Sequence, residues 1–337
     1  MTDRKADSIA FLARHGWGDA DRHFLAGDAS DRSYDRLTRS GESAVLMDAP
    51  PGSGDDPAVF VAIARHLRSI GLSAPKVLAE DYAQGFLLIE DLGDALFARV
   101  VAAEPQRETA LYTAAADVLV HLHRHPAPDG LPNLSASDWA EAAGFALDWY
   151  AYAATGQRPE KSAFVSALAG VLGRHADGAR VMILRDYHAE NLLHLPGRHG
   201  VASVGLLDFQ LAQMGQPGYD LVSMLQDARR DVSPDVARQV TTHFAAATGR
   251  DMASIQTECA VLGAQRALRI LGVFARLCLV SGKSGYLRLI PRVWAQLQQN
   301  LAHPALADLR KICAPLLPPP SHHVLQTIGD KCAIHSH

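Results

Sequence analysis

The chain has 337 residues, of which 48% are hydrophobic and 20% are charged, a composition typical of a globular protein that buries its own core. The 32 Lys and Arg residues against 36 Asp and Glu residues give a formal net charge of -4. This balance excludes the positive field that draws proteins onto nucleic acid or anionic lipid, and no stretch approaches the ~20 apolar residues of a membrane span. We therefore expect neither nucleic acid nor a membrane as a partner.

The four cysteines, Cys259, Cys278, Cys313 and Cys332, lie far apart and form no C-x-x-C pair. This spacing argues against a zinc ribbon, a redox motif or a disulfide framework. The N-terminus lacks the apolar run and small-residue cleavage site of a signal peptide. We expect a soluble protein in the reducing cytoplasm.

The N-terminal part of the chain predicts a short helix followed by an antiparallel sheet. Residues 5–17 alternate charged and apolar residues at helical spacing. From His23 a β-type run leads into a turn at Gly27–Asp31, and two further runs follow, the last at 44–47. Three strands are expected here.

A helix and two more strands complete this part. Pro57 suits the first turn of a helix, apolar residues follow it at spacings of three and four, and Gly71 ends the helix. The second of the next two runs, Gly85–Gly93, is apolar until it reaches an acidic pair and a glycine. The sheet is therefore expected to have five strands.

The rest of the chain is mainly helical in its periodicity. Helices are expected at 107–124, 136–154, 160–174, 218–230, 234–248, 253–281 and 288–300. Two apolar runs around a polar loop, 181–195 and 201–210, interrupt them and predict a β-hairpin that carries a site. Residues 319–337 follow a proline run and are expected to form a loosely held tail.

A pair of motifs in this interruption points to phosphoryl transfer. Asn191 follows Asp186 by five residues, and Asp208 ends the returning strand, where the hairpin brings it beside Asn191. Kinase chemistry needs one carboxylate to orient the attacking hydroxyl and oxygen ligands for magnesium. The alternative is that Asp186 and Asp208 are turn residues or helix caps. The two motifs together, flanked by strands, favour a kinase.

On these motifs the chain resembles the aminoglycoside phosphotransferase family, whose fold is that of protein kinases and choline kinases. The resemblance implies a bilobal α+β fold with a small antiparallel-sheet lobe (1–91), a larger helical lobe (92–318) and the tail (319–337). It also implies ATP and Mg2+ as cofactors, with Asp186 as the catalytic residue and Asn191 and Asp208 as metal ligands. Family members usually read His-Gly-Asp where this chain reads Leu-Arg-Asp at residues 184–186.

A narrower resemblance is to the anomeric kinases that phosphorylate N-acetylmuramate and N-acetylglucosamine in the recycling of cell-wall peptidoglycan. The segments that carry it are GDASDRSYDRL, VLMDAPP, GFLLIEDLG, LRDYHAENLL and YDLVSMLQDARRD. It implies a small-molecule substrate, an amino sugar phosphorylated on its 1-hydroxyl. Aminoglycoside or choline-type kinases and a catalytically weak pseudokinase remain alternatives.

The turn at 27–33 is expected to cover the ATP phosphates. Its backbone N–H groups and the hydroxyls of Ser30 and Ser33 can donate to phosphate oxygens, Arg32 adds a planar charged fork, and Asp31 lies between them. Taken alone, the segment is also an ordinary hairpin turn.

The usual phosphate-gripping lysine of kinases is missing. Met47 and Asp48 stand where the third strand normally carries it, and the helix at 58–70 has no glutamate to pair with it. The loss of both partners suggests a different ATP grip, with Arg32 as a candidate. It also keeps a non-catalytic nucleotide binder open.

Further binding residues follow from the fold that the resemblance implies. Glu90 and Leu92 fall where the chain crosses between lobes, so the Glu90 carbonyl and the Leu92 amide are expected to bind the adenine edge. Trp149 and Tyr150 are candidate sugar contacts, with a core position as the alternative. Arg185 and His188 are further candidate substrate contacts.

Other side chains allow two interpretations each. His121 and His125 would share one helical face and suggest a metal site, but a helix end is the favoured interpretation. Arg229 and Arg230 either meet an anionic substrate, such as the lactyl carboxylate of N-acetylmuramate, or are simply solvated. Asp220 is expected to cap its helix and brace the catalytic loop.

Two rival enzyme classes are disfavoured. A protein kinase would have glycine after Phe209, whereas this chain has Gln210, and no A-P-E element precedes the helix at Tyr219. A metal-dependent hydrolase would have to be built on the histidines.

Overall fold

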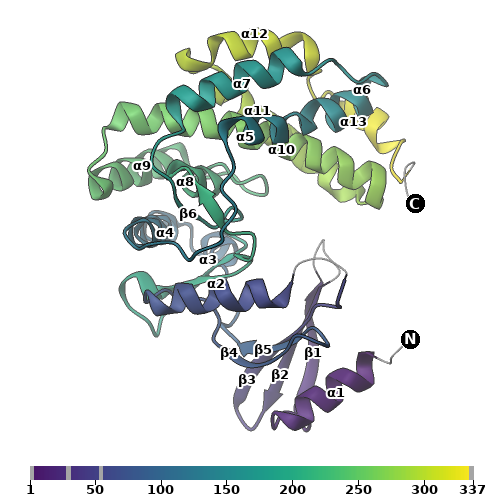
Figure 1. Ribbon diagram of the computed structural model, residues 1–337, viewed down its shortest axis with the longest axis vertical. Coiled ribbons are helices and arrows are strands. Elements are labelled where there is room, and N and C mark those ends of the chain that lie inside the picture. Colours follow the sequence, from purple (N-terminus) through teal and green to yellow (C-terminus); the bar gives the residue numbers. More distant parts are fainter. Residues whose placement is uncertain (1–3, 28–31, 53–55, 334–337) are drawn as a thin grey trace. The chain divides into compact units, whose positions relative to one another are not determined.

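The computed structural model describes residues 4–27, 32–52 and 56–333 and divides into two compact units (Figure 1). The sheet unit comprises Met1–Asp129 and Ala189–Ala212, and the helical unit comprises Gly130–His188 and Gln213–His337. The chain therefore passes from the helical unit into the sheet unit between His188 and Ala189, inside the loop that carries Asp186.

The sheet unit is built on a five-stranded antiparallel sheet with the order β1-β2-β3-β5-β4. Its strands are β1 (Asp21–Gly27), β2 (Ser33–Arg39), β3 (Glu42–Asp48), β4 (Val77–Asp81) and β5 (Phe86–Glu90). The β2–β3 hairpin turns on Ser40 and Gly41, whose φ values are 47° and 82°. Two positive φ angles are typical of the type I′ turn, whose twist matches that of the strands. The five-strand prediction is confirmed.

One helix, α1 (Arg4–Arg14), covers one face of this sheet. Phe11 and Leu12 form a core cluster with Leu37, Leu46 and Phe86 of the strands. Because side chains alternate along a strand, Val45 and Met47 of β3 point to the opposite face.

Helix α2 (Pro57–Ser69) begins with a side-chain cap, since Asp56 Oδ1 accepts a hydrogen bond from Ala58 N at 2.8 Å. Pro57 occupies the first turn, where its missing N–H has no cost, and the predicted helix is confirmed. Its buried residues include Phe60 and Ile63.

The remaining elements of the sheet unit position a hairpin. They are α3 (Phe97–Ala103), η1 (Pro105–Arg107), α4 (Glu108–His123), η3 (Gly200–Ser203) and the paired strands β7 (Leu192–His194) and β8 (Val204–Leu206). Ser73 ties the hairpin to the chain before β4, because its Oγ donates to Ala202 O at 2.7 Å and its carbonyl accepts from Leu206 N at 3.0 Å. The predicted hairpin is confirmed, although the run at 181–183 lies outside it.

The helical unit is organised around the long helix α10 (Met252–Ser281), which supplies more buried residues to the core cluster of this unit than any other described element. Its other elements are α5 (Ala136–Ala143), η2 (Ala146–Ala151), α6 (Tyr152–Thr155), α7 (Ser162–His175), α8 (Gly218–Leu225), α9 (Pro234–Thr248), η4 (Ser284–Leu289), α11 (Ile290–Leu301), η5 (Pro304–Leu306), α12 (Ala307–Leu316) and α13 (His322–Gly329). A short ribbon pairs β6 (Val181–Ile183) with β9 (Gln213–Gly215).

The prediction of a single α-helix at 136–154 is wrong. After α5 the backbone widens into the π-helix η2 and then continues as α6. Helix α10 approaches so closely here that a Cβ on Gly272 would lie 2.2 Å from the carbonyl oxygen of Phe145. This contact between segments distant in sequence carries no local signal.

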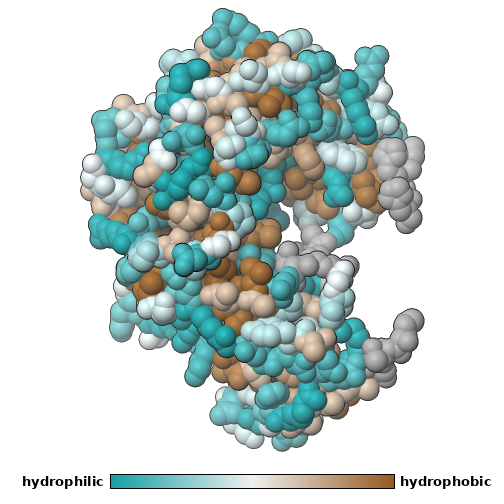
Figure 2. Space-filling view, viewed as in Figure 1, coloured by the Kyte–Doolittle hydropathy of each residue, from teal (hydrophilic) through white to brown (hydrophobic). Residues whose placement is uncertain are grey.

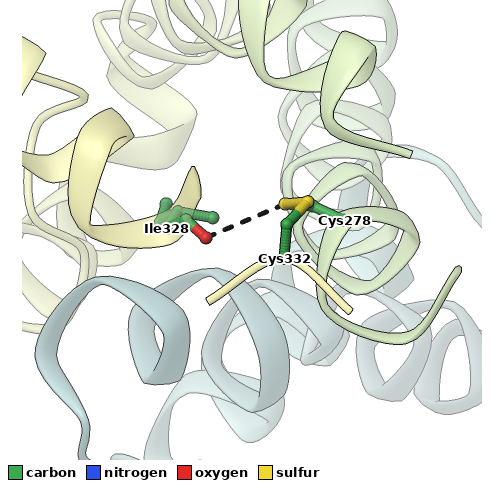
Figure 3. Close-up of a disulfide and its surroundings, with 3 residues drawn as sticks. All are labelled: Cys278, Ile328 and Cys332. Carbon is green, nitrogen blue, oxygen red and sulfur yellow. Dashed lines mark hydrogen bonds between the residues drawn. A yellow bond between two sulfur atoms is a disulfide. The ribbon is translucent and has the colours of Figure 1, made fainter. Parts of the chain in front are cut away.

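The expectation of a loosely held tail is wrong for residues 322–329, which form α13. Ile328 is fully buried, and Cys332 forms a disulfide with Cys278 of α10 (Figure 3). The Cys278 Sγ lies 3.8 Å from the carbonyl oxygen of Ile328, the contact drawn as a dashed line in Figure 3. The argument from cysteine spacing against a disulfide therefore fails for this pair, which is 54 residues apart.

The two compact units divide the chain differently from the lobes predicted to meet at residue 91. Contacts of α3 and α4 with the β7–β8 hairpin place these helices in the sheet unit. The lobe boundary at residue 91 was placed where the chain is expected to cross between lobes and bind adenine, and it stays a prediction.

Hydrophilic residues cover most of the face seen in Figure 2. Within the described ranges, no helix combines the length and the apolar character needed to cross a membrane.

Candidate active site

The catalytic loop, Leu184–His188, follows β6 in the helical unit and is fixed through its backbone. The buried carboxylate of Asp220 accepts hydrogen bonds from Leu184 N at 2.6 Å and Arg185 N at 2.8 Å. Ser223 Oγ donates to the Arg185 carbonyl at 3.0 Å. Arg185 has a φ of 72°, in the left-handed region that non-glycine residues rarely adopt. Both sides of the Arg185 backbone are thus held just before Asp186.

Asp220 bonds as the sequence predicts for a residue that braces the loop. The prediction that it caps its helix is wrong, because α8 begins after Pro217 without a side-chain cap and Asp220 lies in its first turn. Burial, together with the nearby negative charge of Asp186, raises the pKa of Asp220 to about 7. The two backbone N–H groups and the Arg266 guanidinium act in the opposite direction. The Asp186 carboxylate is therefore close enough to Asp220 for their charges to interact.

A second set of polar groups, which we call the metal loop after its predicted role, lies around Asp208 in the sheet unit. Leu207 N donates to the Asn191 carbonyl at 2.9 Å, so the two ends of the β7–β8 hairpin are joined. Asn191 Nδ2 then lies 3.4 Å from Asp208 Oδ2, as the hairpin predicts. Gln210 Nε2 donates to Asp208 Oδ1 at 2.7 Å, a contact that the sequence analysis missed.

The metal loop is anchored to α2 by its neighbouring aromatic residue. The Phe209 ring stacks on Phe60 with centroids 4.9 Å apart, and Phe209 is fully buried. Asp208 itself has a φ of 55°, a conformation that Asp tolerates better than most residues. Phe209 thus fixes the strand end, while the Asp208 side chain stays 32% exposed.

Arg32 lies at the phosphate turn and reaches the metal loop. Its side chain is only 6% exposed, and its Nη2 atom lies 3.5 Å from Asp208 Oδ1. Ser33 begins β2, where it pairs with Gly27 of β1 and Asp48 of β3. Ser30 and Asp31 lie outside the described residues.

The third strand separates its two unusual residues onto opposite faces. Asp48 is directed to the α1 face, where Arg4 Nε donates to its Oδ1 at 3.1 Å. Met47 is buried and points to the other face, away from Arg4. The carboxylate at position 48 is neutralised by Arg4 on the α1 face.

The side chain of Glu90 is engaged in structural bonds at the end of β5. It accepts from Lys76 N at 3.0 Å and pairs with Arg68 at 3.3 Å and Arg198 at 2.5 Å. These contacts fix the segment whose backbone was predicted to bind adenine. That role of the Glu90 carbonyl and the Leu92 amide stays a prediction.

Two aromatic candidates for the sugar site lie in η2. Tyr150 is fully buried, and its hydroxyl donates to Pro318 O at 2.7 Å. Burial also raises its pKa, so its hydroxyl is neutral. These facts favour the core interpretation for Tyr150. Trp149 is half-buried and lies under the Arg276 guanidinium, 5.7 Å from its ring centroid.

The remaining candidates in the catalytic loop differ in exposure. Arg185 is half-buried, whereas His188 is 5% exposed and lies 3.3 Å from Arg229 Nη1 through its Nε2 atom. Burial, with the positive charges of Arg229 and Arg266, lowers the His188 pKa to about 3. His188 is therefore a neutral ring inside the loop.

The histidines at the end of α4 and just after it make structural contacts. His121 Nε2 lies 2.6 Å from the Ile70 carbonyl, and His125 Nδ1 lies 2.8 Å from the His121 carbonyl. In the part of the chain that the structure describes, no cluster of three or more His, Cys, Asp or Glu side chains is arranged to hold a metal. These contacts favour the helix-end interpretation.

Comparisons with known proteins agree with this geometry. The model of the phosphotransferase enzyme family matches residues 21–256. An N-acetylmuramate/N-acetylglucosamine kinase of Caulobacter vibrioides is 38% identical, across 92% of this chain and 95% of its own. The protein of the same name from Pseudomonas putida is 29% identical, across 90% of this chain and 91% of its own.

Solved structures show the fold. A choline/ethanolamine kinase family protein from Mesorhizobium loti has a TM-score of 0.62 at 15% identity and covers 97% of this chain and 99% of its own. The GDP complex of an aminoglycoside 2'-phosphotransferase also has a TM-score of 0.62, at 14% identity, and covers 89% of this chain and 98% of its own. The chain therefore belongs to the phosphotransferase enzyme family and is a phosphotransferase with the protein-kinase-like fold.

Proposed function

We propose that this phosphotransferase is an ATP-dependent kinase that phosphorylates the anomeric hydroxyl of N-acetylmuramate and N-acetylglucosamine. The reaction type is supported by the catalytic loop, in which Asp220 fixes the backbone just before Asp186. Asn191 follows Asp186 by five residues. The acceptor is supported by the names of relatives that are 38% and 29% identical over nearly the whole chain. A cytoplasmic location follows, because turnover needs the nucleotide pool of that compartment.

Asp186 is proposed to orient the sugar hydroxyl and accept its proton. The hydrogen bonds that Asp220 accepts and Ser223 donates hold the backbone before Asp186, so its carboxylate is presented without a large loss of entropy when the sugar binds. An anomeric hydroxyl is more acidic than an ordinary alcohol, so a carboxylate of modest basicity is sufficient.

The residues of the metal loop fit magnesium by their chemistry. Asn191 and Asp208 offer an amide oxygen and a carboxylate, the hard oxygen ligands that Mg2+ prefers. When bound, ATP would supply the phosphoryl group, and the metal would neutralise its negative charge. Asn191 and Asp208 would hold the ion, and the Asn191 and Gln210 amides orient the Asp208 carboxylate before it arrives.

Arg32 is proposed to take the place of the missing lysine. It is buried beside Asp208 at the base of the phosphate turn, whereas the lysine position holds the apolar Met47. A guanidinium binds phosphate oxygens through two parallel N–H groups. We expect Arg32→Met to raise the KM for ATP by about 10-fold or more, since a charged hydrogen bond contributes about 1.5–3 kcal/mol. Arg14→Met, at an exposed ion pair of α1, is the matched control.

The reaction is tested with a panel of acceptors, namely N-acetylmuramate, N-acetylglucosamine, choline and an aminoglycoside, scored by ADP release. We expect turnover with the two amino sugars. Asp186→Asn should abolish it while the thermal shift with Mg-ATP persists. Asp235→Asn, an exposed acid of α9, serves as the control. Unchanged turnover in Asp186→Asn would remove Asp186 from the mechanism.

A pseudokinase is the second candidate, and buried Met47 in the lysine position is the observation that favours it. Such a protein would give a thermal shift with Mg-ATP and no ADP release with any acceptor of the panel. ADP release that depends on an amino sugar excludes it.

A further inference from the structure

An arginine of the sheet holds the segment that follows β5. Arg36 lies in β2, and the strand register pairs it with Val45 of β3, so its side chain points to the face opposite α1. From this face the guanidinium reaches the carboxylates of Asp91 and Asp94. All of these residues belong to the sheet unit. Arg36 therefore ties the sheet to the loop 91–94, which contains one of the residues predicted to bind adenine.

The guanidinium binds both carboxylates at once. Its Nε atom lies 2.8 Å from Asp91 Oδ2, and its Nη2 atom donates to Asp91 Oδ1 at 3.1 Å. Towards Asp94, Nη1 donates to Oδ2 at 2.8 Å and Nη2 donates to Oδ1 at 3.1 Å. A guanidinium has five N–H groups in a rigid planar fork, an arrangement that the compact ammonium of a lysine lacks. Arg36 thus fixes the loop at its first and last residues.

The two carboxylates differ in burial. The Asp91 side chain is 7% exposed, and its Oδ1 atom also accepts from Gly93 N at 2.9 Å. The Asp94 side chain is 58% exposed, and its hydrogen bonds to Arg36 lower its pKa. Loss of the arginine would leave a charge on the buried Asp91 without its counterion, so the loop would have to move to bring that carboxylate into water.

The loop presents the Leu92 N–H in a fixed place. In the described part of the chain, no backbone carbonyl accepts from this group. Glu90 is held just before it by the contacts of its side chain given above. Arg36 lies three residues along β2 from Ser33, at the end of the phosphate turn, so about 10 Å of extended strand separates the two ends. This separation is comparable with that between the base and the phosphates of a nucleotide.

We propose that Arg36 is a positioning residue that fixes the Leu92 amide for the base of ATP and so sets the affinity of the enzyme for the nucleotide. The inference rests on the proposed function, in which ATP donates the phosphoryl group. A backbone donor that is already held in place need not be ordered when the base binds, and this saving appears as affinity. Arg36 acts through the loop and not by its own contact with the nucleotide.

The test is a calorimetric titration of Mg-ATP, without sugar, into the unaltered protein and Arg36→Met. We expect the variant to weaken binding by about 10-fold or more. In turnover assays the KM for ATP should rise by the same factor, while kcat at saturating ATP and the KM for the sugar change by less than about 2-fold. Arg65→Met, at an exposed ion pair between α2 and β4 of the same unit, is the matched control.

A second variant keeps the buried Asp91 paired. Asp94→Ala removes only the exposed carboxylate, so we expect a smaller loss of Mg-ATP binding, of about 2- to 5-fold. Should Arg36→Met fail to fold, Asp94→Ala carries the test alone.

Unchanged binding of Mg-ATP in the variants would overturn the proposal, as would an unaltered protein that does not bind Mg-ATP. A change in kcat or in the KM for the sugar as large as the loss for ATP would also overturn it, because it would show that Arg36 only supports the fold. The titration contains no acceptor. If no sugar is phosphorylated, the proposed function fails, whereas weaker binding of Mg-ATP by Arg36→Met still supports the role of Arg36.

Discussion

The catalytic loop and the metal loop are held by different kinds of contact. Around Asp186 the bonds go to backbone atoms, and the main acceptor is the fully buried Asp220. Around Asp208 the contacts join side chains, from Asn191, Gln210 and Arg32. Backbone bonds to a buried group belong to the fold, whereas contacts among partly exposed side chains can rearrange when a cation enters.

Both loops contain a residue with positive φ, and the difference in residue type supports this comparison. Asp208, at 55°, has a short polar side chain of the kind that tolerates the left-handed region. Arg185, at 72°, has a long side chain that does not favour this region, so its backbone conformation costs on the order of 1–3 kcal/mol. The bonds from Asp220 and Ser223 offset that cost. The catalytic loop is thus the part whose stability and activity should change together.

Asp220→Ala should have the largest effect. It leaves the N–H groups of Leu184 and Arg185 without their buried acceptor, at a cost of about 1–3 kcal/mol each. We expect the free energy of unfolding to fall by about 2–5 kcal/mol and kcat/KM to fall by about 100-fold or more. Urea titration and ADP release measure the two.

Asp231→Ala is the control, because Asp231 is an exposed acid paired with Arg292 in the same unit. It should change stability by less than about 1 kcal/mol. An Asp220→Ala protein with normal stability and reduced turnover would contradict the view that the loop is part of the fold.

Asp208→Asn should separate activity from stability. Asn also tolerates positive φ, and its side-chain oxygen can still accept the hydrogen bond that Gln210 Nε2 donates. We expect the free energy of unfolding to change by less than about 0.5 kcal/mol, while kcat/KM falls by about 100-fold through the loss of a metal ligand. A magnesium titration of ADP release should show the loss as a raised metal requirement. A fall in stability as large as that of Asp220→Ala would remove the contrast between the loops.

Much of the fold was predictable because its signals are local. The five strands, the capped start of α2 and the β7–β8 hairpin each follow from neighbouring residues. The break after α5 and the pairing of Cys278 with Cys332 depend on contacts between segments distant in sequence. No composition or periodicity within a short window encodes such contacts.

The candidate site also combines contacts that the local sequence predicts with contacts that it does not. The proximity of Asn191 and Asp208 follows from one hairpin, and the brace at Asp220 follows from its place after the metal loop. Ser223 and Gln210 were missed, because a serine or glutamine beside an apolar run has many ordinary uses. Tyr150 was predicted as a candidate sugar contact because helical spacing does not reveal which face of a helix is buried, and the structure shows that Tyr150 is buried.

The pH dependence of stability should reveal Asp220 directly. Its pKa is raised to about 7 from 3.8, so the folded state binds a proton that the unfolded state has released between these values. Its contribution to stability is therefore complete below pH 3.8 and is lost as pH rises to about 7. The difference in unfolding free energy between the unaltered protein and Asp220→Asn should fall with rising pH in this window. Its slope is at most about 1.4 kcal/mol per pH unit. A difference that is flat across the window would mean that Asp220 titrates at its ordinary value.

Ser223→Ala should have the smallest effect and gives the finest test of the comparison. The Ser223 hydroxyl donates the bond to the Arg185 carbonyl, and its loss should cost about 1 kcal/mol of stability. Because that carbonyl directly precedes Asp186, kcat should fall by about 2- to 10-fold while the KM for ATP is unchanged. Thr241→Ala in α9, which removes a hydroxyl bonded to a helix carbonyl, is the matched control and should leave kcat unchanged. If Ser223→Ala raised the KM for ATP and left kcat intact, the two loops would not be held independently, because a contact in the catalytic loop would then be setting the nucleotide site.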